Sequence, residues 1–328
     1  MQPLVSVMMI AYNQENFIDE AIRGVILQEV PFGVELVIGD DCSTDSTAER
    51  CRRWQEKYPD VIRLLPRNEN LGVQRNYIDV YSHCRGRYIA VCEGDDYWCD
   101  RTKLKRQVEY MEAHVGCTVC FHRVVNYYID TRTMSLSNGG QREDTTVVDL
   151  ARSNYITNLS VMYRRGVFGE LPVWVEQVAA PDYVFHMLHA SKGYIHYISR
   201  PMAVYRQSAK GVWSMVGEKR RLRMSMDVRE RLMAYFAKEP DIVSGLNDAY
   251  TAIAISLILA CESSGGEDDV PLVRGRIFRY RPGWDDDDLL HEIERVKMLK
   301  IHSRGMSVGK IMKKIRAMVS YFMPRPRI

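Results

Sequence analysis

The segment Cys92–Asp100, CEGDDYWCD, places three acidic residues in four positions directly behind the apolar run RYIAVC. Carboxylates as close together as those of Glu93, Asp95 and Asp96 repel one another unless a cation or hydrogen-bond donors hold them. Acids also favour the first turn of a helix, and the following segment, RTKLKRQVEYM, is predicted to be helical. Because Asp100 already stands where it would cap that helix, the three acids one turn upstream need a cation or a set of donors.

Further polar residues stand where other predicted strands end. Strand-like runs alternate with segments whose apolar residues recur at helical spacing. The predicted strands cover residues 4–12, 34–41, 61–66 and 87–96, and the predicted helices cover residues 16–28, 43–58 and 73–84. Ser43 or Thr44 is expected to cap the second helix. Such βαβ units build a parallel sheet covered on both faces. Its ligands lie beyond the carboxyl ends of the strands, where residues 11–13, 40–41 and 93–96 are expected to converge.

The alternation is looser in the second half of the chain. Strands are predicted over residues 158–165 and 193–206, with a helix near residues 182–191 between them, and the remaining pattern is helical. The sequence thus predicts an α/β domain over residues 1–215 and a helical C-terminal region over residues 216–328.

The composition is that of a folded protein with a basic end. Of the 328 residues, 46% are hydrophobic and 27% are charged, which excludes a disordered chain. No secretory signal is expected, and the longest apolar helical stretch, Ala249–Cys261, is shorter than the roughly 20 residues that span a bilayer. The eight cysteines show no framework spacing and are expected to be buried free thiols of a reducing cytoplasm. Residues 295–328 contain ten Lys or Arg and no acid. Since the net charge of the whole chain is +3, the remaining residues carry a net charge of 3 − 10 = −7.

Three segments carry a resemblance to a known family. Taken in order, VSVMMIAYNQENFIDEAIRGVILQ, VELVIGDDCSTDST and NENLGVQRNYIDVYSHCRGRYIAVCEGDDYW resemble the nucleotide-sugar-binding half of the family-2 glycosyltransferases. The resemblance is close over residues 4–130 and continues more loosely to about Ser214 through PDYVFHMLHASKGYIHYI and AVYRQSAKGVWS. It implies an α/β GT-A fold, with a Rossmann-like, mostly parallel sheet flanked by helices and a helical C-terminal extension.

By this resemblance, three residues would bind the nucleotide of the donor. The tyrosine that ends the first strand, here Tyr12, would pack on the base, a contact that suits an aromatic face. The second acid after the second strand, here Asp41, would accept a hydrogen bond from uracil, whose imide N–H suits a carboxylate. Arg75 matches the loop arginine that reaches toward the nucleotide. The alternative for Asp40 and Asp41 is a cap for the next helix, and the alternative for Arg75 is a place on a helix surface.

The same resemblance assigns the acidic cluster to a metal. The segment EGDD matches the D-x-D motif of the family, with Glu93 where many members have Asp, so the role of Glu93 stays open. Asp95 would lie near the ribose, and Asp96 would ligate Mg²⁺ or Mn²⁺ bridging the two phosphates. Such hard cations take oxygen ligands and bind through few carboxylates plus substrate phosphates. The acids would repel one another until the cation and the diphosphate arrive.

The resemblance also implies a general base. The residue at the matching position is Asp182, which follows Pro181 at the start of a predicted amphipathic helix. The alternative role for Asp182 is that of a plain helix N-cap. Many relatives have Glu-Asp or Gly-Asp at this point, so Pro-Asp departs from the pattern. His186 and His189, three residues apart on this helix, are predicted to pack or lie at the surface, since no third metal ligand is evident.

The segment VYRQSAKGVWS resembles the loop that closes over the donor diphosphate. Arg206 and Lys210 would contact the phosphates, and Trp213 would cover the pocket.

These residues predict an inverting glycosyltransferase that moves a sugar from a UDP-sugar to an acceptor hydroxyl. Asp182 would remove the acceptor proton, and the metal on Asp96 would stabilise the departing diphosphate. One alternative is a metal-dependent nucleotidyltransferase, which would need a glycine-rich basic loop where the chain has AYNQENF; another is a non-catalytic nucleotide-sugar-binding protein. Relatives of this size commonly build bacterial surface polysaccharides, which implies a saccharide or lipid-linked saccharide acceptor and a cytoplasmic location at the inner face of the cell membrane.

The basic C-terminal segment, residues 305–328, is predicted to be an amphipathic helix. Its apolar face would consist of Val308, Ile311, Met312, Ile315, Met318, Val319 and Phe322. The pattern fits a helix in a membrane interface, drawn to anionic lipid, and the alternative is a helix packed on the acidic body. Nucleic-acid binding is not expected, because the segment has few aromatic residues and the body is acidic.

Overall fold

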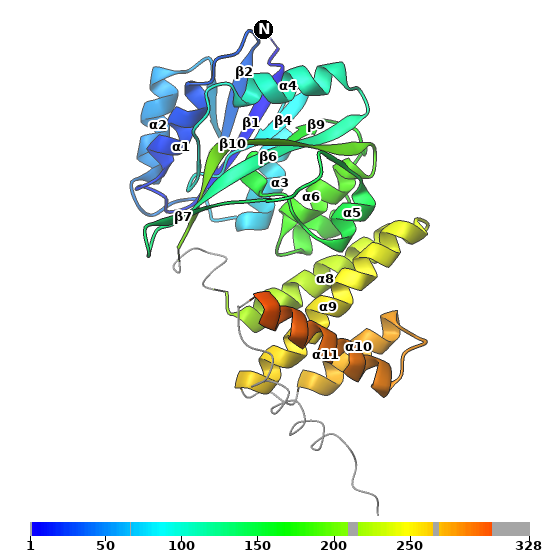
Figure 1. Cartoon of the computed structure of the whole chain (residues 1–328). Helices are drawn as coiled ribbons and strands as arrows, with labels where there is room; N and C mark the ends of the chain where they lie inside the picture. Colours follow the sequence, from blue (N-terminus) through cyan, green and yellow to red (C-terminus); the bar gives the residue numbers. More distant parts are fainter. Residues whose placement is uncertain (1, 66, 209–215, 265–268, 304–328) are drawn as a thin grey trace, which may run out of the picture. The chain divides into compact units, whose positions relative to one another are not determined.

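The computed structural model describes residues 2–65, 67–208, 216–264 and 269–303 (Figure 1). The chain divides into two compact units, residues 1–250 and 251–328, and each is described by itself. The strands are β1 (Val5–Ala11), β2 (Val34–Asp40), β3 (Ile62–Leu65), β4 (Tyr88–Val91), β5 (Tyr97–Trp98), β6 (Cys117–Tyr128), β7 (Thr133–Leu136), β8 (Asp144–Thr145), β9 (Met162–Arg164) and β10 (Tyr194–Gln207). The helices are α1 (Ile18–Ile26), α2 (Thr47–Lys57), α3 (Val73–His83), α4 (Lys103–Ala113), α5 (Val147–Arg152), α6 (Pro181–Ala190), α8 (Glu218–Tyr235), α9 (Pro240–Ser264), α10 (Val270–Tyr280) and α11 (Asp286–Ser303), with 3-10 turns η1 (Asn158–Ser160) and η2 (Val173–Gln177).

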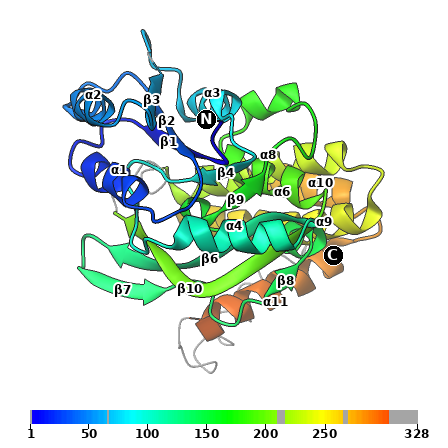
Figure 2. The ribbon, with the colours of Figure 1, turned by 90° about the horizontal axis from the view of Figure 1, so that it is seen from above.

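Among the described residues, ten strands form one sheet with the order β3-β2-β1-β4-β9-β6-β10-β5, while β7 and β8 pair beside β6 and β10. The pairs among β1, β2, β3 and β4 are parallel, and so is the pair of β6 and β10; β9 joins the two sets antiparallel to both. Helices α1 and α3 lie on opposite sides of β1 and β2 (Figure 2). The predicted α/β fold with a mostly parallel sheet flanked by helices is confirmed.

Apolar periodicity explains the N-terminal half. Strand β1 is buried along almost its whole length, as expected of a parallel strand covered on both faces. Helix α1 buries Ile18, Ala21, Ile22 and Val25, which recur at helical spacing. Helix α3 crosses β2 closely at Gly39, where a Cβ would lie 2.4 Å from Asn76 Oδ1. This approach brings the start of α3 to the end of β2.

Two boundaries differ from those expected. Helix α2 begins at Thr47, so the prediction that Ser43 or Thr44 caps it was wrong. Both residues serve another contact: the Ser43 hydroxyl accepts from the amide of Asn13, and the Thr44 amide donates to the Asn13 side chain. The predicted strand over residues 158–165 is the turn η1 followed by the short strand β9.

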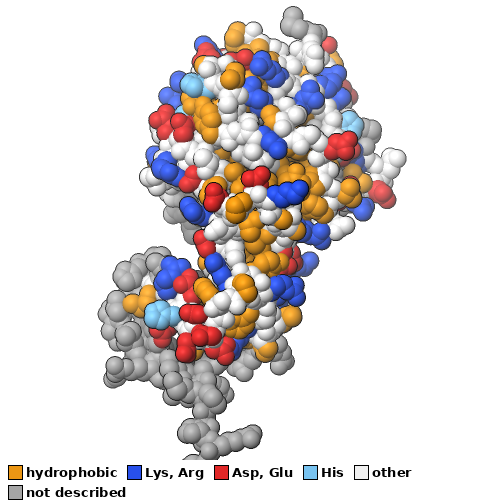
Figure 3. Space-filling model, turned by 90° about the vertical axis from the view of Figure 1, so that its right-hand side faces the viewer, with side chains coloured by type: hydrophobic (Ala, Val, Ile, Leu, Met, Phe, Trp, Pro, Cys, Tyr) orange, Lys and Arg blue, Asp and Glu red, His pale blue; other side chains and the backbone are white. Residues whose placement is uncertain are grey.

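The C-terminal helices are confirmed, and α9 is longer than its apolar stretch suggested. By length and apolar composition, residues 240–263 of α9 could cross a membrane, yet 56% of an apolar 18-residue window within them is buried inside the protein, as in a core helix. All eight cysteines are free, as predicted, and six of them are buried; the prediction of burial was wrong for Cys42, which is half-buried, and for Cys99, which is exposed. Basic and acidic side chains are interspersed over the face shown in Figure 3. The predicted basic helix over residues 305–328 lies outside the described residues.

Candidate active site

Three chain segments meet at the carboxyl edge of the parallel strands. Strands β1 and β2 run side by side with Ala11 opposite Asp40. Beyond β4 the chain continues along β1, because the amide of Gly94 donates to the carbonyl of Ile10 at 3.0 Å. The acidic residues 93–96 therefore follow the same edge of the sheet as the ends of β1 and β2.

The glycine of EGDD is required by this approach. A Cβ on Gly94 would lie 2.2 Å from Gln14 Oε1 and 2.9 Å from Ile18 Cδ1, closer than real contacts allow. The absence of a side chain lets the acidic loop lie against the start of α1.

Asp96 is the most buried acid of the cluster, with 1% of its surface exposed. One carboxylate oxygen accepts a hydrogen bond from the amide of Arg206 at 2.7 Å, whereas the other, Oδ2, is buried without a partner among the described residues. Burial, followed by the charges of Asp95 and Glu93, raises the pKa of Asp96 well above its ordinary value. An orphaned buried oxygen of this kind is costly unless a ligand satisfies it.

Three further groups share this environment. Burial, then the charges of Asp95 and Asp182, raises the pKa of Glu93 to about 8. Burial also raises the pKa of Asp95. Tyr205, from β10, lies within electrostatic reach of all four acids, and burial together with their charges raises its pKa. Acids from two distant segments, residues 93–96 and the start of α6, therefore form one cluster, in which Asp96 is buried and the others are half-buried.

Asp182 lies in the first turn of α6. The helix begins at Pro181, and Ala180 occupies the N-cap position, so Asp182 is not the N-cap residue. Burial raises the pKa of the Asp182 carboxyl, although hydrogen bonds from its own amide and that of Tyr183 lower it. A carboxylate with a raised pKa accepts a proton more readily, which suits a general base.

The cluster fits a hard divalent cation. Within the described ranges, no group of three or more His, Cys, Asp or Glu side chains is already arranged around a metal position. However, Mg²⁺ and Mn²⁺ bind through few carboxylates and complete their coordination with substrate phosphates. The partnerless oxygen of Asp96 and the mutual repulsion of its neighbours are what such a cation would satisfy.

Arg206 lies against the acidic loop. Its guanidinium donates to the carbonyl of Asp95 at 2.9 Å, forms an ion pair with Glu20, and stacks over the rings of Tyr97 and Phe17 at 4.4 and 5.0 Å. The side chain is 9% exposed. Its donors thus serve intramolecular contacts that fix β10 on the acidic loop.

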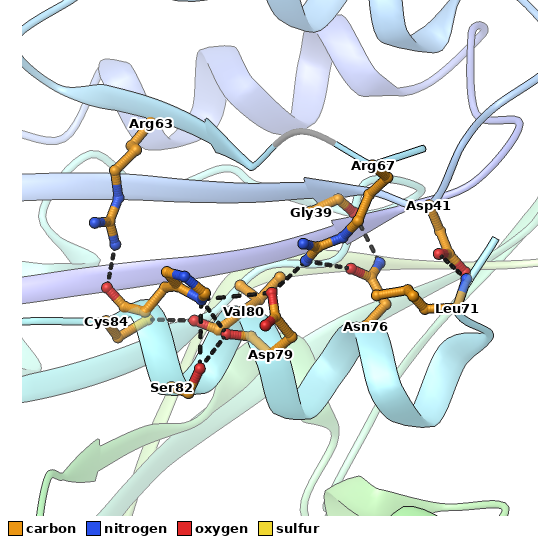
Figure 4. Close-up of polar contacts among 11 residues, drawn as sticks. Gly39, Asp41, Arg63, Arg67, Leu71, Asn76, Asp79, Val80, Ser82 and Cys84 are labelled. Atoms are coloured by element: carbon orange, nitrogen blue, oxygen red, sulfur yellow. Dashed lines mark hydrogen bonds and ion pairs between the residues drawn. The ribbon is translucent and has the colours of Figure 1, made fainter. Parts of the chain in front are cut away.

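The Asp41 carboxylate faces a different environment. One oxygen accepts a hydrogen bond from the amide of Leu71 at 2.7 Å (Figure 4), and the other accepts one from the amide of Gly72 at 2.9 Å. Gly72 has a φ of +82°, a left-handed conformation that favours glycine. Asp41 therefore holds the loop that leads into α3, and Arg75 follows in the first turn of that helix with an exposed side chain.

Tyr12 is left open beside this loop, with 42% of its surface exposed. The adjoining loops are tied together: the amide of Asn13 donates to Ser43 Oγ at 2.9 Å, and the amide of Thr44 donates to Asn13 Oδ1 at 2.8 Å. An exposed aromatic ring on a rigid rim can stack on a flat ligand.

Comparison with known proteins agrees with this geometry. Residues 6–172 match the model of the family described as "Glycosyl transferase family 2", which is just over half of the chain. The chain belongs to glycosyl transferase family 2.

The family-2 chain is similar to three bacterial proteins among others. It is 40% identical over 211 residues to an uncharacterized protein of Mycobacterium tuberculosis, a match covering 64% of this chain and 60% of that protein. It is 34% identical over 110 residues to the putative teichuronic acid biosynthesis glycosyltransferase TuaG of Bacillus subtilis, covering 34% and 42%. It is 30% identical over 135 residues to the Escherichia coli enzyme WfaP, named a UDP-Glc:alpha-D-GlcNAc-diphosphoundecaprenol beta-1,3-glucosyltransferase, covering 39% and 47%. The chain thus spans less than two thirds of the length of these relatives.

Solved structures share the fold of the family-2 chain. TarS of S. aureus, residues 1–349, in complex with UDP-GlcNAc superposes with a TM-score of 0.56 at 17% identity, over 87% of this chain and 93% of that one. The mannosyltransferase PcManGT of Pyrobaculum calidifontis, in complex with GDP-Man and Mn²⁺, gives a TM-score of 0.54 at 18% identity, over 86% and 82%. Both are glycosyltransferases, and the GT-A fold is confirmed.

The structure brings together most residues that the family-2 motifs indicated. Glu93, Asp95, Asp96 and Asp182 form the acidic cluster, with Arg206 at its edge, while Tyr12, Asp41 and Arg75 belong to the rim over β1 and β2. Lys210 and Trp213 lie outside the described residues. The roles assigned to all of these side chains stay predictions.

The motifs missed two side chains that surround the cluster. Asn158 contacts Glu93 from η1, and Tyr205 faces the acids from β10. Asn158 begins the segment that was predicted to be a strand over residues 158–165 and forms the turn η1 instead, so nothing in the sequence distinguished it as a site residue. Tyr205 stands beside Arg206 in a motif that was recognised, and the alternation of β10 could have indicated that neighbouring side chains face opposite ways.

Proposed function

We propose that this family-2 protein is an inverting glycosyltransferase that moves a sugar from a UDP-sugar to an acceptor hydroxyl. The observation that carries the proposal is the single cluster formed by the buried Asp96 and its neighbours with Asp182. An inverting transfer needs a positive group for the leaving diphosphate and a base for the incoming hydroxyl. The acids after β4 supply ligands for a cation that would bind the diphosphate, and Asp182 supplies a carboxylate base.

The chain's own residues have distinct tasks in this reaction. Asp96 would hold a Mg²⁺ or Mn²⁺ ion, with Asp95 near the ribose, and the bound ion would stabilise the departing diphosphate as a Lewis acid. Asp182 removes the proton from the acceptor hydroxyl as that oxygen forms a bond to the anomeric carbon. The bond between this carbon and the diphosphate oxygen breaks, and UDP leaves. Tyr12 and Asp41 hold the uracil, with Arg75 reaching toward the nucleotide.

The names of the relatives support the substrate classes. WfaP is named for a UDP-glucose donor and a diphosphoundecaprenol acceptor, and TuaG for teichuronic acid biosynthesis. We infer a saccharide or lipid-linked saccharide acceptor in bacterial surface polysaccharide synthesis. The protein would act in the cytoplasm at the inner face of the membrane.

Peripheral membrane contact through residues 305–328 belongs to the same proposal. Deletion of these residues should release the protein from vesicles of anionic lipid and leave turnover on a soluble acceptor unchanged. Undiminished vesicle binding by the truncated protein would favour packing on the body.

A donor screen tests the function. The full chain is incubated with Mn²⁺ and a panel of UDP-, GDP- and dTDP-sugars, and release of the nucleotide is measured with and without saccharide acceptors. The proposal expects release of UDP from one or a few UDP-sugars. Release of GDP or dTDP alone would overturn the choice of donor, and binding of UDP without turnover of any sugar would favour the non-catalytic alternative.

A further inference from the structure

A buried chain of hydrogen-bonding side chains leads away from Glu93. It begins at Asn158, on η1, which is 8% exposed. The hydroxyl of Tyr77, on α3 and 2% exposed, donates to Asn158 Oδ1 at 3.3 Å. Burial and then the charges of Asp182 and Glu93 raise the pKa of Tyr77, as expected for a phenol beside both carboxylates.

This contact fixes the orientation of the Asn158 amide. Because its oxygen takes the proton of Tyr77, its NH₂ group is directed elsewhere. The Asn158 side chain is also the hydrogen-bonding neighbour of Glu93, where it lowers the pKa of the carboxyl. A carboxylate can only accept, so the amide supplies the donor that Glu93 needs.

The other end of the chain reaches α6. Tyr77 and Tyr163, on β9, are hydrogen-bonding neighbours, and Tyr163 Oη lies 2.5 Å from His186 Nδ1. His186 is fully buried and stands four residues after Asp182, one turn along the same helix. Burial, then the charge of His189, lowers the pKa of His186 to about 3, so the ring is a neutral hydrogen-bonding group.

We propose that Asn158 and Tyr77 are positioning residues, whose hydrogen bonds orient the Glu93 carboxylate relative to Asp182 by linking it through Tyr163 to the helix that carries Asp182. Four elements, η1, α3, β9 and α6, contribute one side chain each to this network. A carboxylate in a cluster of repelling acids would otherwise turn away from its neighbours. The inference rests on the proposed function, because orientation at this point matters only if the sugar is transferred there.

The chain offers a matched control on the same helix. Tyr81 follows Tyr77 by one turn on α3 and also contacts a histidine of α6, with Tyr81 Oη 3.1 Å from His189 Nε2. His189 in turn contacts the carbonyl of Phe185 through Nδ1 at 2.7 Å. Tyr81, which is half-buried, therefore has a comparable hydroxyl whose partner is His189 rather than Asn158.

The kinetic test compares Tyr77→Phe, Tyr81→Phe and Asn158→Asp in the full chain, with the donor found by the screen. Asn158→Asp keeps the oxygen that accepts from Tyr77 but replaces the donor that faces Glu93. We expect Tyr77→Phe to lower kcat about 3- to 10-fold and Asn158→Asp to lower it more than 10-fold, with KM for the donor within about twofold. Tyr81→Phe should keep kcat within about twofold. Equal kcat for Tyr77→Phe and Tyr81→Phe, or a loss confined to KM, would overturn the proposal.

A stability test needs no substrate and separates this inference from the function. Melting temperatures are measured for Tyr77→Phe, Tyr81→Phe, Asn158→Ala and the two double variants. When two residues belong to one network, removing both lowers the stability by less than the sum of the two single losses. When two residues are independent, the losses of stability add. For the double variant Tyr77→Phe with Asn158→Ala, we expect the loss of melting temperature to be smaller than the sum of the two single losses by about 2 °C or more. For Tyr81→Phe with Asn158→Ala, the loss should equal that sum. Additive losses in both pairs would contradict the network even if the protein proves to use another donor.

Discussion

Two pairs of adjacent acids follow two parallel strands, β2 and β4, which lie on either side of β1, and their surroundings differ. After β2, the oxygens of Asp41 each accept from a backbone amide, those of Leu71 and Gly72. After β4, Asp96 keeps one buried oxygen without a partner among the described residues, and acids lie next to it. The two pairs look alike in sequence. The comparison shows that the supply of donors, rather than the number of acids, separates a carboxylate that holds a loop from one that awaits a cation.

The largest expected effect is that of Asp96→Asn. Without the charge of the Asp96 carboxylate, the site should no longer hold the cation that binds the diphosphate. Turnover should therefore fall by about 10³-fold or more. The melting temperature of the metal-free protein should rise, because repulsion among the acids is relieved. Turnover assays in Mn²⁺ and thermal unfolding in EDTA check both parts. If Asp96→Asn kept wild-type turnover, Asp96 would not bind a required cation, and it would no longer differ in role from Asp41.

Asp182→Asn should lower kcat by about 10²-fold, the loss typical of a missing general base. Affinity for UDP should stay nearly unchanged, because Asp182 acts on the acceptor. Steady-state kinetics and a UDP titration separate the two quantities. If UDP affinity collapsed instead, Asp182 would belong to the donor end and the base would lie elsewhere.

A pH series tests whether the acids of the cluster are strained. The folded-state pKa of Glu93, about 8, lies above its ordinary 4.5, so between these values the folded protein holds a proton that the unfolded chain has released. The free energy of unfolding should therefore fall by about 1 kcal/mol per pH unit as the pH rises from 5 to 8 in EDTA. Glu93→Gln should flatten this slope, as measured by denaturant titration. An identical slope in wild type and variant would contradict the raised pKa.

The smallest effect is expected for Asp41→Asn. The side-chain amide keeps only one acceptor oxygen, and its NH₂ group would face a backbone amide that also donates; because the Gly72 amide keeps Asn70 Oδ1 at 3.0 Å as a partner, the cost should not exceed about 1 kcal/mol. Metal-free stability should thus fall where that of Asp96→Asn rises, and UDP binding should weaken. The free energy of unfolding is measured for both variants under the same metal-free conditions. A rise in both variants would mean that the hydrogen bonds of Asp41 do not stabilise the fold.

The sequence predicted the sheet and the convergence of its strand ends because both follow from local periodicity and βαβ connection. It also identified the acids, whose clustering is visible along the chain. It did not predict which acids are satisfied, since the donors to Asp41 come from residues some thirty positions away. Ser43 and Thr44 resembled helix caps, yet tertiary contacts with Asn13 use them instead. Asn158 and Tyr77 were missed for the same reason: their importance arises from partners that only the fold brings near.

The central claim is that the acids after β4 are completed by a divalent cation and a nucleoside diphosphate. The most direct measurement is a calorimetric titration of UDP into the full chain, once with Mn²⁺ and once with EDTA, repeated for Asp96→Asn and Asp41→Asn. Wild type should bind UDP with Mn²⁺ and lose most of that affinity in EDTA, Asp96→Asn should bind weakly in both, and Asp41→Asn should keep its dependence on Mn²⁺. Equal affinity of the wild type with Mn²⁺ and with EDTA would contradict the account.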